Sequence, residues 1–228
     1  MTSATPTATE LAQHEAAPSH SSASLGNPVL GMLLFITSEV MFFAGLFAAY
    51  FSIRAAYTEL VGGVASHMWP PSQCVDPHRV LDPFRLTTES GDLNLILPAT
   101  IILVLSSFTC QMGVWAIRRD DRTGFLRNFS ITLVLGITFL VMQIYDYTVL
   151  YNEGMALGKD TFGTTYFTLT GFHGAHVFGG ALMLGVVVYR GMAGQFSGKH
   201  HDMVEATSLY WHFVDVVWIL LFSILYLL

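Results

Sequence analysis

Two histidines three residues apart, His173 and His176, form the residue pair in this sequence with the clearest potential for chemistry. The spacing puts both imidazoles on one face of a helix, where they could supply two ligands to a metal ion. A metal site also needs a third and usually a fourth ligand from elsewhere. Hydrogen bonds to a neighbouring helix, a lipid headgroup or water are therefore the alternative use of this pair.

A second polar set lies near the end of the chain, where Glu205, Ser208, His212 and Asp215 fall at offsets of zero, three, seven and ten. These offsets place all four side chains on one stripe of a helix. A stripe of this kind must face protein or a cavity, because lipid tails cannot satisfy it. Trp211 lies beside the stripe and is interpreted as a packing or interface anchor.

Two further carboxyl groups, Glu39 and Asp146, lie within apolar runs. Glu39 is on the order of 16 Å into its run at the helical rise of 1.5 Å per residue, which places it near the bilayer midplane. Two interpretations of Glu39 stay open: a proton-linked or lipid-gating carboxyl, or a structural hydrogen bond between helices. Asp146 shares a face with Gln143, and its position near the end of the run favours an ordinary interfacial carboxylate.

The composition indicates whether these groups lie in a soluble protein or in a membrane protein. Of the 228 residues, 53% are hydrophobic and only 11% are charged, and the mean hydropathy is +0.54, so the chain is a membrane protein. A net charge of −6 provides no basic surface for phosphates, which makes nucleic acid an unsuitable partner. The two cysteines, Cys74 and Cys110, cannot build a CxxC metal pattern or a disulfide framework.

Five apolar runs are long enough to cross a bilayer as helices, and they are continuous rather than alternating. The predicted fold is therefore all-α, a polytopic membrane protein with a bundle of five transmembrane helices. We expect a disordered tail at 1–27 and a membrane domain at 28–228, in which a proline-containing extramembrane loop occupies 55–92. The predicted helices span about 28–54, 93–117, 125–151, 162–189 and 203–228.

The distribution of basic residues predicts the orientation. Loops on one side carry six Lys and Arg residues, four of them arginines in and beside one short loop, and the loops on the other side carry four. We therefore expect the N-terminus in the cytoplasm of a bacterial plasma membrane and the C-terminus on the outer side. The sequence contains no GxSxG, P-loop, HExxH or histidine-box series.

Several stretches resemble the signature segments of cytochrome c oxidase subunit III, and they occur in that family's order. They are Ser38–Phe47, Trp69–Pro71, Thr170–Val177 and Tyr210–Trp218, and Ser106–Gly113 is similar to actinobacterial-type forms. The chain begins where the third helix of the seven-helix members begins, so it resembles the short five-helix form. In that form the two missing helices are often an extension of subunit I.

The resemblance implies a non-catalytic core subunit of an aerobic respiratory haem-copper oxidase, a proton-translocating oxidoreductase. This chain would hold no metal or redox cofactor, and haem and copper would lie in partner subunits I and II. It would bind phospholipid, stabilise subunit I and support proton uptake and sustained turnover. Further partners would be small subunits and a respiratory supercomplex.

The resemblance also implies roles for particular residues. Intramembrane carboxyls linked to protons or lipid would be Glu39, Asp146 and Glu205. A polar seam in contact with lipid or subunit I would consist of His173, His176, Trp211, His212 and Asp215. Glu39 matches the family's intramembrane glutamate, and His173 and His176 match its paired histidines. Asp146 falls where many members have Glu, so its carboxyl is one methylene closer to the backbone. The motif of the last helix is matched by Glu205, Trp211, His212 and Asp215.

Four alternatives stay open from the sequence. The closest is subunit III of a quinol oxidase, and a more distant one is an accessory protein of a nitric oxide reductase. A freestanding membrane metalloenzyme would use His173, His176 and His212 as ligands. A transporter is the fourth, although the sequence contains no discontinuous helices or paired repeats.

Overall fold

A computed structural model describes residues 26–60, 94–152, 154–158, 161–198 and 200–227 of the chain. These residues form five long helices and one C-terminal π-helical turn: α2 Asn27–Leu60, α4 Ile96–Arg118, α5 Arg122–Asn152, α6 Thr161–Met192, α7 Asp202–Phe222 and η2 Ser223–Leu227. Each of the five helices is long and apolar enough to cross a membrane. The prediction of an all-α bundle of five transmembrane helices is confirmed.

Local sequence explains where the helices start. Pro28 occupies the first turn of α2, where its missing N–H breaks no helical hydrogen bond. Asp121 precedes α5, and its Oδ1 accepts a hydrogen bond of 2.9 Å from the N–H of Gly124, as an N-cap residue does. The turn before it requires the left-handed backbone of Asp120, whose φ is 57°, a conformation that Asp adopts more readily than most residues.

One difference from the predicted boundaries is at the end of the first helix. We predicted that this helix ends at residue 54, but α2 continues to Leu60. The added turns contain Ala, Glu and Leu, which favour helix even after the apolar stretch has ended. Residues 1–25 and 61–93, and with them most of the predicted tail and loop, lie outside the described residues.

The last predicted helix differs at its C-terminal end. The segment expected as one helix at 203–228 is an α-helix only to Phe222, and a π-helical turn follows it. A π turn shifts the direction of the side chains that follow it. In this chain the hydroxyl of Tyr226, in the π turn, contacts that of Tyr166 on α6.

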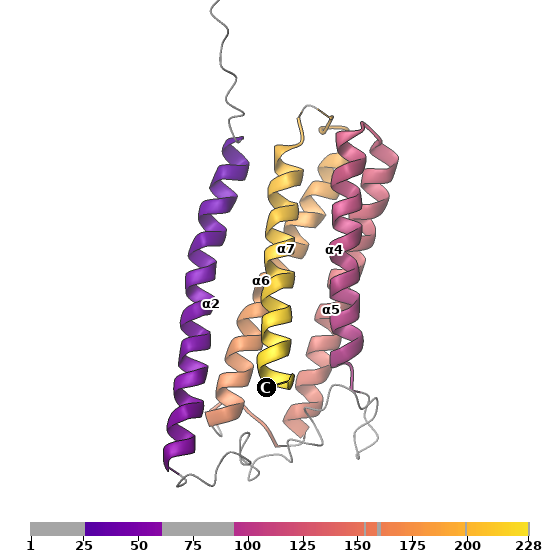
Figure 1. Cartoon of the computed structure of the whole chain (residues 1–228). Helices are drawn as coiled ribbons and strands as arrows, with labels where there is room; N and C mark the ends of the chain where they lie inside the picture. Colours follow the sequence, from indigo (N-terminus) through magenta and orange to yellow (C-terminus); the bar gives the residue numbers. More distant parts are fainter. Residues whose placement is uncertain (1–25, 61–93, 153, 159–160, 199, 228) are drawn as a thin grey trace, which may run out of the picture.

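Four of the helices form a closed bundle, in which α4 contacts α5, α5 contacts α6, α6 contacts α7 and α7 contacts α4. The fifth helix, α2, packs outside this bundle, mainly on α7. Figure 1 shows α2, α7 and α4 side by side, with α7 between the other two. Successive helices run in opposite directions, as the short connections predicted. The central position of α7 makes it the helix on which polar groups can meet those of three neighbours.

Close approach of α5, α6 and α7 depends on two glycines. A Cβ atom at Gly136 would lie 2.5 Å from Cη2 of Trp211, and one at Gly180 would lie 2.9 Å from Cε3 of the same ring. Trp211 is fully buried. The indole therefore fills the space that these two glycines leave between the helices.

Candidate functional site

A row of hydrogen bonds joins α4 to α7 along most of their length, and we call it the α4–α7 seam. Its residues are Thr100, Ser106, Ser107, Cys110, Gln111 and Arg118 on α4, and Glu205, Ser208, Trp211, His212, Asp215 and Trp218 on α7. The contacts run from the pair Arg118–Glu205 at one end of the seam to the pair Thr100–Trp218 at the other. Residue numbers therefore fall along α4 as they rise along α7, as two antiparallel helices require. The predicted polar stripe of the last helix thus faces α4.

At the centre of the seam, the hydroxyl of Ser107 links two ionisable side chains of α7. Its Oγ lies 3.2 Å from Nδ1 of His212 and donates a hydrogen bond to Oδ2 of Asp215. The serine therefore lies between the histidine and the aspartate. In the catalytic triad of hydrolases the histidine lies between the other two. The order found here links the two α7 side chains to each other and does not activate the serine.

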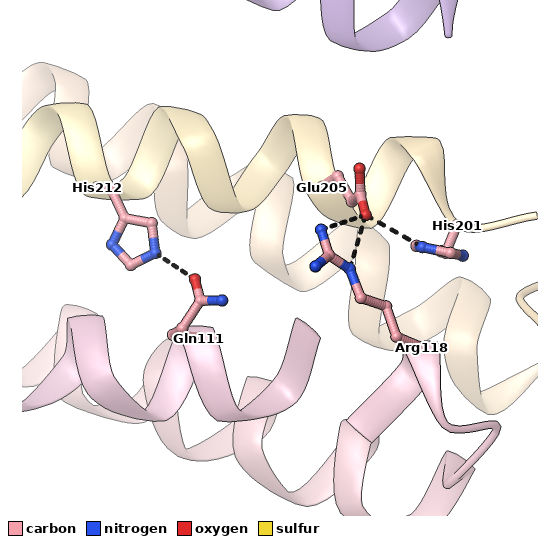
Figure 2. Close-up of polar contacts among 5 residues, drawn as sticks. All are labelled: Gln111, Arg118, His201, Glu205 and His212. Carbon is pink, nitrogen blue, oxygen red and sulfur yellow. Dashed lines mark hydrogen bonds and ion pairs between the residues drawn. The ribbon is translucent and has the colours of Figure 1, made fainter. Parts of the chain in front are cut away.

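Hydrogen-bond accounting relates the protons in this group to one another. A hydroxyl has one hydrogen, so when Asp215 is ionised Ser107 donates to Asp215 and accepts from His212, whose Nδ1 then carries a proton. Nε2 of His212 lies 3.3 Å from Oε1 of Gln111 (Figure 2). That contact needs a second ring proton or a Gln111 amide turned to present its N–H₂. The other oxygen of Asp215, Oδ1, is buried and has no partner among the described residues.

The two tryptophans of the seam hydrogen-bond to hydroxyl groups of α4. Nε1 of Trp211 donates to Oγ of Ser106 at 2.9 Å, and Nε1 of Trp218 donates to Oγ1 of Thr100 at 3.0 Å. Both rings are buried. These bonds satisfy the indole N–H groups inside the bundle, as buried tryptophans require.

One end of the seam is an ion cluster at the start of α7. Oε1 of Glu205 accepts from Nε and Nη2 of Arg118 at 3.0 and 2.7 Å. The same oxygen lies 3.1 Å from Nε2 of His201. Figure 2 shows all three nitrogens converging on this oxygen, while the other carboxylate oxygen points away from them. Exposed fractions of 52% for the Arg118 side chain and 27% for that of Glu205 place the pair at the surface of the bundle.

A second polar contact joins α2 to α6. Nε2 of His176 lies 3.0 Å from Oε2 of Glu39, and both side chains are mostly buried, with exposed fractions of 16% and 19%. Glu39 lies near the middle of the apolar span Asn27–Ala56, as the sequence predicted. Rings of Phe42 and Phe43 pack around the imidazole.

The two histidines of α6 contact different neighbours and do not form the pair of metal ligands that their spacing allowed. His173 is fully buried inside the four-helix bundle, stacked on Trp218 with ring centroids 5.0 Å apart. Neither of its ring nitrogens has a hydrogen-bond partner among the described residues. His176 points instead to Glu39 on α2. Positions three residues apart on an α-helix differ in direction by about 60° around the helix axis. Because two helices pack on α6, this difference is enough to direct the two rings to different neighbours.

Asp146 belongs to a third polar group, near the C-terminal end of α7. Its Oδ2 accepts a hydrogen bond of 3.3 Å from Tyr166, which also contacts Tyr226. Nearby, Nε2 of Gln143 donates to the carbonyl of Thr170 at 2.8 Å. A cavity between these groups has about 20 Å³ of room for the centre of a water molecule, which is enough for one. The predicted pairing of Gln143 and Asp146 on one face is therefore present, although they contact different partners.

The described residues contain no group of three or more His, Cys, Asp or Glu side chains close enough to hold a metal ion. The alternative of a freestanding metalloenzyme required His173, His176 and His212 to converge. They are directed to Trp218, Glu39 and the pair Ser107–Gln111, respectively. The donor set for that site is therefore missing from this part of the chain.

Several partners in these contacts were missed by the sequence reasoning. They are Ser107, Gln111 and Arg118 on α4, together with Tyr147, Tyr166, His201, Tyr210 and Tyr226. A signal was available for Ser107 and Gln111, because they are four residues apart in a mostly apolar run and so lie on one helix face. The tyrosines gave no comparable signal, because tyrosines are also common at membrane interfaces.

Comparison with known proteins identifies the family of this chain. The family model for cytochrome c oxidase subunit III matches residues 12–228. Cytochrome c oxidase subunit 3 of Corynebacterium diphtheriae is 40% identical over 207 residues, which cover 90% of this chain and 91% of the relative. A protein of Nocardia farcinica named as a probable cytochrome c oxidase subunit 3 is 39% identical over 197 residues, 86% of each chain. The subunit 3 of Thermostichus vulcanus is 36% identical over 203 residues, 88% of this chain and 87% of the relative. The chain therefore belongs to the cytochrome c oxidase subunit III family.

Proposed function

We propose that this chain is the non-catalytic core subunit III of an aerobic respiratory haem-copper cytochrome c oxidase. In this role it stabilises subunit I, binds phospholipid, and supports proton uptake and sustained turnover. Haem and copper are carried by partner subunits I and II. The observation that carries the proposal is the family match over residues 12–228, which includes all five helices.

The internal chemistry of the chain supports a structural role. The hydrogen-bonding side chains of the α4–α7 seam pair mainly with one another, so they join helices and do not present a nucleophile or a convergent ligand set to a substrate. A bundle fixed in this way offers a rigid surface to a catalytic subunit. Bound phospholipid is supported by α2, of which only 11% of the apolar window is buried. The rest of that helix is an apolar surface suited to acyl chains.

The Glu39–His176 contact supports a role in sustained turnover. It is a polar link between α2 and the four-helix bundle at membrane depth. Loss of this link would free α2 from α6 and change how lipid packs beside it. In this proposal Glu39 acts as a protonatable carboxyl that also joins α2 to α6, and His173, Asp146, Glu205, Trp211, His212 and Asp215 act by fixing the bundle.

We also propose a bacterial plasma membrane location with the N-terminus in the cytoplasm. Four arginines, Arg118, Arg119, Arg122 and Arg190, lie at or near one end of the bundle, where α4 and α6 end and α5 begins. Basic residues favour the cytoplasmic side. This assignment puts the C-terminus on the outer side, because the helices alternate in direction.

The test is to tag the chain and purify it from native membranes in mild detergent. A reduced-minus-oxidised spectrum and mass spectrometry of the co-purifying chains are then recorded. Haem bands together with an oxidase subunit I are the expected result, and the donor that restores turnover distinguishes a cytochrome c oxidase from a quinol oxidase. A haem-free preparation without an oxidase chain, under conditions that keep oxidases intact, would overturn the proposal.

A further inference from the structure

A cavity lies inside the four-helix bundle at the end where α7 passes into the π turn η2, the end marked C in Figure 1. All four bundle helices and η2 contribute to its walls. We call it the Asp146 cavity. About half of its lining is apolar, and the polar lining consists of Gln143, Asp146, Tyr147, Tyr166, Thr170 and Tyr226. The cavity has about 20 Å³ of room for the centre of a water molecule.

Three of these polar side chains are satisfied by other groups of the protein. The amide nitrogen of Gln143 donates to the carbonyl of Thr170 at 2.8 Å and to the hydroxyl of Tyr147 at 3.2 Å. The Tyr147 hydroxyl donates to Oγ1 of Thr170 at 2.7 Å, and the Thr170 hydroxyl donates to the carbonyl of Tyr166 at 2.7 Å. All donor hydrogens of Gln143, Tyr147 and Thr170 are therefore in use.

The other polar side chains form a chain of contacts from η2 to α5. The hydroxyl of Tyr226 lies 2.5 Å from that of Tyr166, which donates to Oδ2 of Asp146 at 3.3 Å. A hydroxyl has one hydrogen, so the hydrogen between the two tyrosines comes from Tyr226. The hydroxyl oxygen of Tyr226 still has a lone pair that can accept a bond, and an ionised carboxyl such as that of Asp146 accepts several.

Asp146 is the group in this chain of contacts that a further donor would stabilise most. Its carboxyl belongs to the membrane span Arg122–Asn152, where an ionisable side chain is costly unless it is well hydrogen-bonded or paired. The bond from Tyr166, at 3.3 Å, is longer than the usual O–H···O distance of about 2.5–3.0 Å. A donor inside the cavity would offset part of the cost of placing the carboxyl at this depth.

Water fits the cavity and its hydrogen-bonding groups better than a metal cation does. A water molecule has two hydrogens, one for Asp146 and one for the oxygen of Tyr226, and the cavity has room for one such molecule. Hard cations take about six or more oxygen ligands. Among the described residues no group of three or more His, Cys, Asp or Glu side chains could hold a metal ion, and Asp146 is the carboxyl in the lining of this cavity.

We propose that the Asp146 cavity is a binding site for one water molecule, which bridges Asp146 and Tyr226. The water closes a ring of hydrogen bonds, in which Tyr226 donates to Tyr166, Tyr166 donates to Asp146, and the water donates to Asp146 and Tyr226. A buried network whose members are all satisfied is rigid. The ring joins η2 to α5 and α6, so the water fixes the C-terminal turn on the bundle. The site uses residues of this chain alone and does not depend on the proposed function.

The first measurement is a cryo-electron microscopy map of the complex that is purified from native membranes with the tagged chain, at a resolution that shows ordered water. We expect one density peak within about 3.2 Å of both the Asp146 carboxyl and the Tyr226 hydroxyl. A map with ordered water elsewhere in the complex and no peak in the cavity would overturn the inference. So would a peak with contacts of about 2.3–2.6 Å to several oxygens, because such distances identify a cation.

The second measurement uses Tyr226→Phe, which removes the hydroxyl and retains the ring that packs on Tyr166 and Phe222. Tyr189→Phe on α6 is the matched control, because Tyr189 is 70% exposed. In Tyr226→Phe we expect the density peak to disappear and the amides of Ser223–Leu227 to exchange with deuterium about tenfold faster, since the bonds to Tyr166 and to the water are both lost. Tyr189→Phe should leave the peak and the exchange unchanged. A peak that persists in Tyr226→Phe, or exchange equal to that of the wild type, would contradict the proposed bridge.

Discussion

The imidazole of His176 and the carboxyl of Glu39 share one proton between α6 and α2. Nδ1 of His176 lies 2.7 Å from the carbonyl oxygen of Phe172, and a carbonyl only accepts, so Nδ1 carries a hydrogen. Nε2 lies 3.0 Å from Oε2 of Glu39. One further proton between these two atoms gives either a neutral pair or an ion pair. Both forms have zero net charge, which is the least costly state in a membrane.

This relationship predicts the effect of replacing Glu39 by Gln. The amide can still donate to Nε2 of His176, so we expect assembly of the oxidase to be unchanged, with a stability difference below about 1 kcal/mol. The shared proton is lost, and we expect a shorter active lifetime during continuous turnover. Oxygen consumption followed over many turnovers, with proton pumping measured in vesicles, tests this. Unchanged lifetime and pumping would mean that Glu39 is only structural.

The packing of Trp211 predicts opposite results for two glycine substitutions in the bundle. Gly136→Ala puts a methyl group 2.5 Å from the indole, and we expect it to destabilise the subunit by roughly 1–3 kcal/mol through overpacking. Gly185→Ala on α6 is the matched control, because no atom lies within 4 Å of the added carbon. It should be neutral or stabilising by up to about 1 kcal/mol. Thermal release of this chain from the purified oxidase measures both.

The link between His212 and Asp215 predicts a difference between two substitutions at Ser107. Ser107→Ala removes the donor to Oδ2 of Asp215, whose Oδ1 already has no partner among the described residues. We expect a loss of about 1–3 kcal/mol, the usual cost of an unsatisfied buried polar group. Ser107→Thr retains the hydroxyl and should keep most of the stability. Equal midpoints of thermal release for wild type and Ser107→Ala would contradict the proposed link.

The ion cluster at the end of the seam should contribute less to the stability of the subunit than its number of contacts suggests. Arg118 is largely exposed, so water and salt screen its attraction to Glu205. We expect Glu205→Gln to change stability by less than about 1 kcal/mol, and the difference to shrink further at high ionic strength. Denaturation at two salt concentrations provides the measurement. A large, salt-independent loss would show that Glu205 has an essential buried partner.

The sequence by itself determined the number of helices and the location of the polar stripe on α7. Without water the backbone must satisfy its own hydrogen bonds, so five long apolar runs gave five helices. The offsets of Glu205, His212 and Asp215 gave a common face because helical periodicity is fixed. The extent of α2 beyond residue 54 was missed because helix formation does not stop where lipid stops.

Only the tertiary structure decided which partner each polar group meets. A helix such as α2 is apolar on its buried side and on its lipid-facing side, so its sequence does not reveal which side packs on α7. For the same reason the spacing of His173 and His176 could not show that one faces Trp218 and the other Glu39. Pairing of Ser107 with Asp215 joins residues more than a hundred positions apart. Such contacts depend on how helices pack against each other, which local periodicity does not encode.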